Sequence, residues 1–173
     1  MTWTAPTIDR SDEPALGTER ESLQGWLDYH RQTLLLKCAG LTHEQLAQRS
    51  AEPSGLSLLG IVRHMADVER WWFRTNLRGE DLQGFFGPDD NLEGDFDDLD
   101  SLPAEEVLAV FERECLDADA AAYGIELEQT FRSRGHGTEL DLRWLYLHMI
   151  EEYARHNGHA DILRERIDGV TGD

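Results

Sequence analysis

The chain has 173 residues, a length that fits one domain, because chains rarely split into several domains below about 250 residues. It carries 35 acidic and 16 basic side chains, a formal net charge of −19, which argues against nucleic acid or an anionic membrane as partner. Hydrophobic residues make up 40%, enough for a packed interior. No apolar run approaches the roughly 18–20 residues that cross a bilayer, and residues 1–17 lack signal-peptide features. We therefore expect a cytoplasmic protein that binds no membrane.

Four stretches of the chain show the apolar spacing that is typical of amphipathic helices. The first covers residues 18–40, where Thr18 and Glu21 form a capping box and His30 lies within the apolar stripe. A second capping box predicts a short helical turn at residues 42–45. The first long helix therefore presents one histidine toward the core.

The second long helix is predicted over residues 57–79. On the helical wheel His64 lies on the apolar face near its edge, with Trp71 on the same side, whereas Arg63 lies on the other face. His64 therefore points inward. Trp71 is most simply a core aromatic, although it also borders any pocket beside His64.

A long surface loop is predicted over residues 84–101, which are acidic, rich in Gly and Asp and without helical periodicity. Residues 89–100 match the Ca²⁺-binding loop only in part, because the last position is Asp100 instead of Glu. A solvated acidic loop is the preferred interpretation. The third helix is expected to begin near Pro103 and to end at Gly124.

The fourth helix is predicted to begin at Thr138, a candidate N-cap, and to end before Gly169, with no convincing strand ahead of it. Together the elements predict an all-α protein, an antiparallel four-helix bundle with long loops between helices two and three and between helices three and four. We expect an N-terminal extension over residues 1–17, the bundle over residues 18–168 and a C-terminal tail over residues 169–173.

Three polar side chains lie on the inward face of the fourth helix. Glu152, His156 and His159 occur at i, i+4 and i+7, so they project from one side together with apolar residues. Burying these groups is costly unless they pair with one another or bind an ion. Imidazoles with one carboxylate suit Zn²⁺, Ni²⁺, Fe²⁺ or Mn²⁺. A third ligand must come from another helix, and His64 is the natural candidate; a buried hydrogen-bonded network without metal is the alternative.

Two stretches resemble the DinB/YfiT-like superfamily of metal-binding four-helix bundles. They are GLSLLGIVRHMADVERWWF over residues 55–73 and HMIEEYARHNGHADILR over residues 148–164. The resemblance covers most of the chain and implies a metal triad of His64, Glu152 and His156. A His-Glu-His triad is similar to that of the mycothiol-dependent maleylpyruvate isomerase branch, which the rest of the chain does not match closely.

Further residues are candidates for the surroundings of this site. His159 stands where the superfamily usually has Gln, and it is a candidate for a fourth ligand, for a substrate contact or for a group that hydrogen-bonds to a ligand from behind. His30 is either a core histidine or a wall of the metal pocket, which Trp71 also borders. An inward arginine would help to bind a carboxylate-bearing substrate, and Arg63 and Arg164 are the candidates.

The resemblance implies an enzyme with a divalent metal, Zn²⁺ first and Ni²⁺ or another ion as alternatives, and a low-molecular-weight thiol such as mycothiol as cosubstrate. Metal coordination would keep the thiol as a thiolate, which attacks an electrophilic small molecule in S-transfer or in a thiol-assisted isomerisation. Superfamily members are often dimers, so we expect a homodimer. The alternative function is a non-catalytic metal-binding or stress-associated dimeric helical-bundle module.

Overall fold

The computed structural model of the protein describes residues 2–87, 91, 94–135 and 137–172. This part of the chain is mostly helical, as the periodicity predicts, and carries a small two-stranded sheet. In chain order the elements are α1 (Glu19–Cys38), α2 (His43–Leu46), α3 (Leu58–Glu69), the π-helical η1 (Arg70–Leu77), α4 (Gly94–Asp97), α5 (Ala104–Ala122), β1 (Thr130–Arg132), β2 (Glu139–Asp141) and α6 (Leu142–Asp168). Within the described ranges, no helix is both long and apolar enough to span a membrane.

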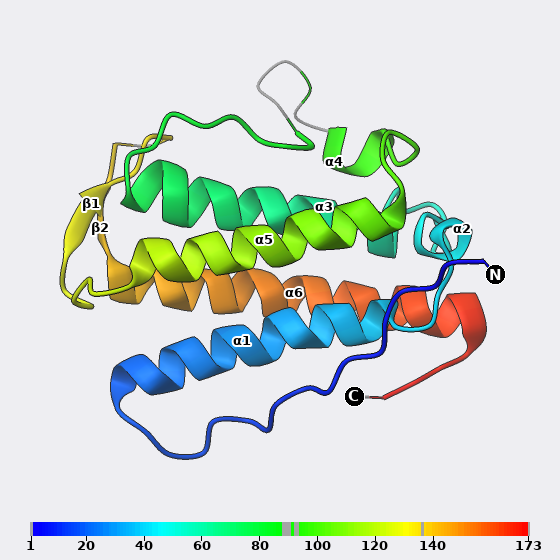
Figure 1. Ribbon diagram of the computed structural model, residues 1–173, viewed down its shortest axis with the longest axis horizontal. Coiled ribbons are helices and arrows are strands. Elements are labelled where there is room, and N and C mark those ends of the chain that lie inside the picture. Colours follow the sequence, from blue (N-terminus) through cyan, green and yellow to red (C-terminus); the bar gives the residue numbers. More distant parts are fainter. Residues whose placement is uncertain (1, 88–90, 92–93, 136, 173) are drawn as a thin grey trace.

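The long helices lie side by side and form two pairs, and the two helices of a pair run in the same direction (Figure 1). α1 packs along α6 and both run the same way, whereas α3 packs along α5 and both run the opposite way. In a bundle that is antiparallel throughout, by contrast, helices that pack side by side run in opposite directions. Because α3 and α5 share one direction, the chain between them must return along the length of the bundle, which explains the long second connection.

Helix ends follow the local signals in the sequence. The Thr18 hydroxyl accepts the backbone N–H of Glu21, and the Glu21 side chain accepts the backbone N–H of Thr18. Thr42 starts α2 with the same device, and Pro103 directly precedes α5. Gly169 ends α6 at a φ of 78°, a left-handed conformation that glycine adopts without steric cost. These predictions are confirmed because a cap depends only on neighbours in the sequence.

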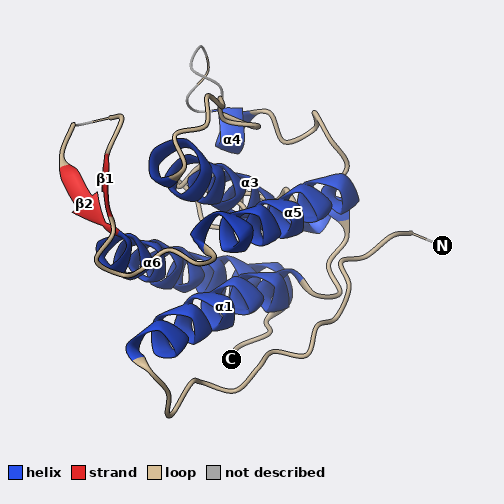
Figure 2. Cartoon of the chain, turned by 60° about the vertical axis from the view of Figure 1, so that its left-hand side comes forward, coloured by secondary structure: helices blue, strands red, loops and turns tan. Residues whose placement is uncertain are grey.

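A β-hairpin precedes α6, where the sequence predicted no strand. Thr130–Arg132 pairs antiparallel with Glu139–Asp141, and the hairpin lies at the end of the bundle where α6 begins (Figure 2). Asp141 caps α6, its carboxylate accepting the backbone N–H of Trp144 at 2.7 Å. The prediction of Thr138 as the cap was wrong, because strand pairing holds the residues before Leu142 in an extended conformation.

Part of the predicted acidic surface loop is folded against the bundle. The single turn α4 packs on α3, where Gly60 leaves room: a Cβ on this residue would come within 2.9 Å of the Phe96 ring. Asp95 on this turn is only 6% exposed, so a solvated loop is the wrong description here. The partial calcium pattern includes residues 89, 90, 92 and 93, which lie outside the described residues.

The N-terminal extension follows the outer side of α1 without forming a helix over residues 2–17 (Figure 2). The backbone N–H of Ala5 donates to the Leu41 carbonyl at 2.9 Å, and the Ala5 carbonyl accepts from Gly40 at 2.8 Å. Ala5 is itself buried. The extension therefore packs onto the helical core.

A buried carboxylate joins the long helices at the centre of the bundle. Glu69 on α3 is fully buried and receives a bidentate hydrogen bond from Arg31 on α1, at 2.7 and 2.8 Å. The Tyr153 hydroxyl of α6 donates to the same carboxylate at 2.7 Å. Arg31 also donates to Asp119 on α5 at 2.8 Å. Each long helix thus contributes to one polar network.

Breaking this network should destabilise the bundle. We expect Glu69→Ala to lower the free energy of unfolding by about 3–5 kcal/mol, because Arg31 then stays buried without its main counter-charge. Denaturant unfolding followed by circular dichroism measures the change. Glu80→Ala, which breaks the more exposed pair with Arg74, is the control and should cost less than about 1 kcal/mol. Equal losses in the two variants would contradict this role of Glu69.

Candidate functional site

The three residues predicted as metal ligands lie together between α3 and α6. His64 comes from the middle of α3, and Glu152 and His156 come from successive turns of α6. One ligand atom from each residue lies within 4.8 Å of the other two. The ring centroids of His64 and His156 are 4.8 Å apart, and His156 Nε2 lies 3.6 Å from a Glu152 oxygen. The fold therefore brings two imidazoles and one carboxylate to one point.

The surroundings of His156 test whether this set fits a metal. The residue is 9% exposed, and its Nδ1 is buried with no hydrogen-bond partner among the described residues. Burial, together with the nearby His64 and His159, lowers the pKa of His156 to about 4, so the ring is neutral at pH 7 and has a free lone pair. Its other nitrogen, Nε2, faces Glu152 at 3.6 Å. Two imidazoles and one carboxylate that lie this close together are a donor set that fits a divalent cation such as Zn²⁺.

A further residue that sequence analysis missed supports His64. Asp95 Oδ2 lies 2.8 Å from His64 Nδ1, which assigns the ring proton to Nδ1 and leaves Nε2 free. The sequence placed Asp95 in the solvated acidic loop. The one available signal was Gly60, a small residue in an otherwise apolar helix face, which permits the close approach of α4.

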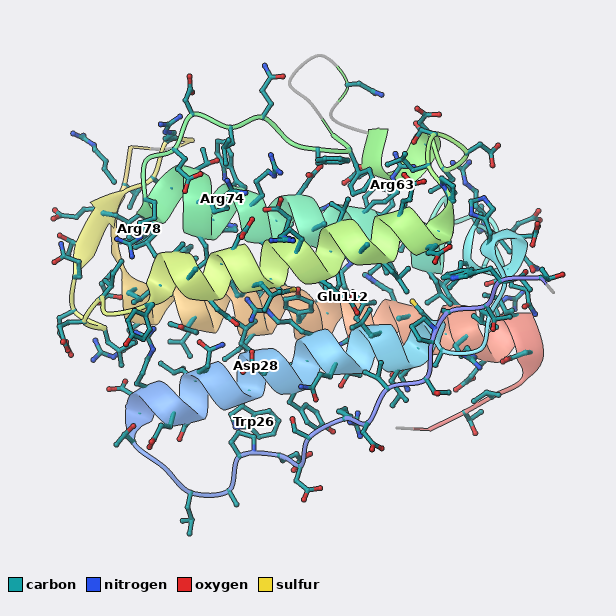
Figure 3. The ribbon with its side chains drawn as sticks, in the orientation of Figure 1. Trp26, Asp28, Arg63, Arg74, Arg78 and Glu112 are labelled. Carbon is teal, nitrogen blue, oxygen red and sulfur yellow. The ribbon has the colours of Figure 1, made fainter. Side chains whose placement is uncertain are left out.

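The two arginines predicted to bind a carboxylate substrate form hydrogen bonds with the backbone. Arg63 is 1% exposed and donates to the carbonyl oxygens of Gly94 and Asp98, so it lies against α4 (Figure 3). Arg164, near the end of α6, donates to two carbonyl oxygens at the C-terminal end of α1, both at 2.9 Å. These contacts give both side chains a structural role.

The two other predicted histidines, one on α6 and one on α1, lie in different settings. The His159 ring is 5.4 Å from the His156 ring, and its Nδ1 is buried without a hydrogen-bond partner among the described residues. His159 therefore neighbours the triad. His30 on α1 lies beside Asn157, whose side-chain nitrogen donates to the His30 carbonyl at 3.0 Å. This contact places the half-buried His30 at the interface of α1 and α6.

A cavity of about 280 Å³ opens beside His64 and Asp95. Trp71 lines it, and so do residues 82, 83, 84 and 87 of the segment that follows η1. Asp67 fixes that segment, because its carboxylate accepts the backbone N–H groups of residues 85, 86 and 87 at 2.5, 2.9 and 2.7 Å. Trp71 is 39% exposed, so its prediction as a core aromatic was wrong; it lines the cavity together with His64.

A second group of potential ligands shares Glu152 with the triad. His148, Glu151 and Glu152 also have ligand atoms within 4.8 Å of one another. Glu151 is exposed, and His148 stacks on Trp144 with ring centroids 4.8 Å apart and an interplanar angle of 10°. The aromatic contact accounts for the position of His148, so we assign the candidate site to the first group.

The fold and the site define a helical bundle with a His-Glu-His group and an adjoining cavity in its interior. The family model of mycothiol-S-transferase matches residues 22–169. The chain therefore belongs to the mycothiol S-transferase family, and the predicted membership of the DinB/YfiT-like superfamily is confirmed. The comparisons with curated proteins and with solved structures found no match.

Proposed function

We propose that the protein is a metal-dependent transferase that joins the sulfur of mycothiol to an electrophilic small molecule. Membership of the family supports a mycothiol-linked transferase, and it favours S-transfer over the isomerisation that the triad also suggested. The observation that carries the metal-dependent part is the convergence of His64, Glu152 and His156 from two helices.

His64, Glu152 and His156 would hold the ion, with Zn²⁺ as first candidate and Ni²⁺ as alternative. When bound, such an ion supplies a Lewis acid that lowers the pKa of a thiol at the site. Three protein ligands leave at least one coordination position open, which is the pattern of catalytic rather than structural metal sites.

The chain prepares this site with residues outside the triad. Asp95 holds the Nδ1 proton of His64, so that the other ring nitrogen is free. Asp67 fixes the segment that walls the cavity, and the cavity offers space for an electrophile next to His64. During transfer the thiol proton passes to solvent, a sulfur–carbon bond forms and the leaving group departs with its electron pair.

The first test is metal content. We expect purified protein to bind about one divalent ion per chain, and His156→Ala to lose it because two remaining ligands hold a metal poorly. Elemental analysis and a chelator competition titration measure both. His43→Gln on α2, outside the triad, is the control and should keep the ion. The site would be refuted if metal-free wild type bound Zn²⁺ no more tightly than His156→Ala does.

The second test concerns Asp95. We expect Asp95→Ala to weaken Zn²⁺ affinity by roughly 10–100-fold, because His64 loses the partner that orients its ring. The nitrogen chemical shifts of His64 should show loss of the Nδ1-protonated tautomer in the metal-free variant. Asp97→Ala removes an exposed carboxylate from the same turn and should leave the affinity unchanged. Equal affinities in the two variants would exclude a role of Asp95 in metal binding.

The third test is turnover. Metal-loaded protein should accelerate the reaction of mycothiol with a chlorobimane beyond the rate with free metal, and His156→Ala should remove this acceleration. Fluorescence of the bimane thioether measures the rate. No acceleration with any of several electrophiles would favour the non-catalytic binding module.

A further inference from the structure

The cavity beside His64 has a largely apolar wall. Val68, Trp71 and Leu82 line it, and Trp71 remains 39% exposed. The π-helical η1 carries both Trp71 and Thr75 on this wall. A volume of about 280 Å³ lies near the lower end of small-molecule pockets, roughly 300–1,000 Å³. These features suit a small molecule that presents a flat apolar face to the indole ring.

The charges around the cavity disfavour an anion. Asp67 and Asp95 border it. Among the described residues Arg70 is the lining cation, and its guanidinium donates to the buried Glu114 at 2.6 and 3.2 Å. Arg63 is buried and donates to the backbone carbonyls of Gly94 and Asp98. Within residues 2–87 and the other described ranges, the arginine that lines the cavity therefore already has an acidic partner, which competes with a substrate carboxylate.

A bound divalent ion does not make the surroundings of the cavity positively charged. The inference rests on the proposed function, in which two positive charges at the triad are balanced by Glu152 and by the thiolate. Arg70 and Glu114 also balance each other. The Arg63 guanidinium offsets only part of the negative charge of Asp67, Asp95 and Asp98, so the carboxylates still leave a net negative charge beside the cavity.

We propose that the electrophile is an uncharged aromatic or similarly flat apolar molecule that stacks on Trp71, and that carboxylate-bearing molecules are discriminated against. This replaces the substrate class that Arg63 and Arg164 suggested from the sequence. The specificity follows from the apolar wall, from the carboxylates beside the cavity and from the acceptors that Arg63 and Arg70 already have.

Binding of two unreactive probes tests the proposal on the full chain loaded with Zn²⁺ and mycothiol. Acetanilide and 4-acetamidobenzoate differ by one remote carboxylate, and ligand-observed NMR titration measures their affinities. We expect acetanilide to bind about tenfold more tightly, since one added charge facing two carboxylates is worth roughly that factor. Equal affinities, or tighter binding of the carboxylate, would overturn the proposal.

Variants of residues in the cavity wall test whether the two probes bind in this cavity. Gln83 is exposed and lines the cavity, so Gln83→Arg should improve binding of 4-acetamidobenzoate about fivefold and Gln83→Glu should not. Trp71→Ala should weaken acetanilide binding about tenfold, whereas Leu116→Ala, an exposed apolar position on α5, should not. Unchanged binding in both Gln83→Arg and Trp71→Ala would show that the probes bind elsewhere, and it would overturn the proposal.

Turnover of iodoacetanilide and its para-carboxylate separates the two proposals. In this reaction the mycothiol sulfur forms a bond to the methylene carbon, iodide leaves with the carbon–iodine electron pair, and the thiol proton passes to the buffer. Faster turnover of the neutral compound, after correction for the uncatalysed rates, supports both proposals. If the probes bind as expected and neither compound reacts faster than without protein, the proposed function fails and the cavity specificity stands.

Discussion

The fully buried Glu69 carboxylate is the constraint on which the arrangement of the helices depends. A buried charge requires partners with good geometry, and here they come from two other helices, Arg31 on α1 and Tyr153 on α6. Glu69 follows His64 along α3 by little more than one turn, and Tyr153 is the neighbour of Glu152 on α6. The network that satisfies Glu69 therefore also fixes the axial position of α3 relative to α6. This position sets the distance between the proposed ligands.

The interior of the bundle holds two kinds of buried polar group, which differ in how completely they are hydrogen-bonded. Glu69 has its acceptor sites filled by Arg31 and Tyr153, so it acts as a structural anchor. His156 is similarly buried, yet its Nδ1 meets no hydrogen-bond partner among the described residues. His156 lies one turn after Tyr153 on α6, and the contrast between the fully bonded Glu69 and this incompletely bonded imidazole supports a binding role for His156.

The directions of the helices explain how the rest of the site arises. Because α3 and α5 run the same way (Figure 1), the connection between them has to pass back over α3. Along this path Asp67 holds the segment that walls the cavity, and Asp95 meets His64. A connection that topology makes long thus supplies both the support of a proposed ligand and the space for a substrate.

From the sequence alone came the long helices, the caps of α1 and α2 and the spacing of Glu152 and His156, because these depend on periodicity and on groups a few residues apart. The inward position of His64 followed from the same periodicity. Only the tertiary structure decided the partner of His64, since Asp95 lies 31 residues away along the chain, and only it decided the exposure of Trp71 and the pairing of Glu69. Those contacts form between elements that lie far apart in the sequence, and burial and charge compensation across the whole core determine how these elements pack. A local sequence pattern therefore does not predict them.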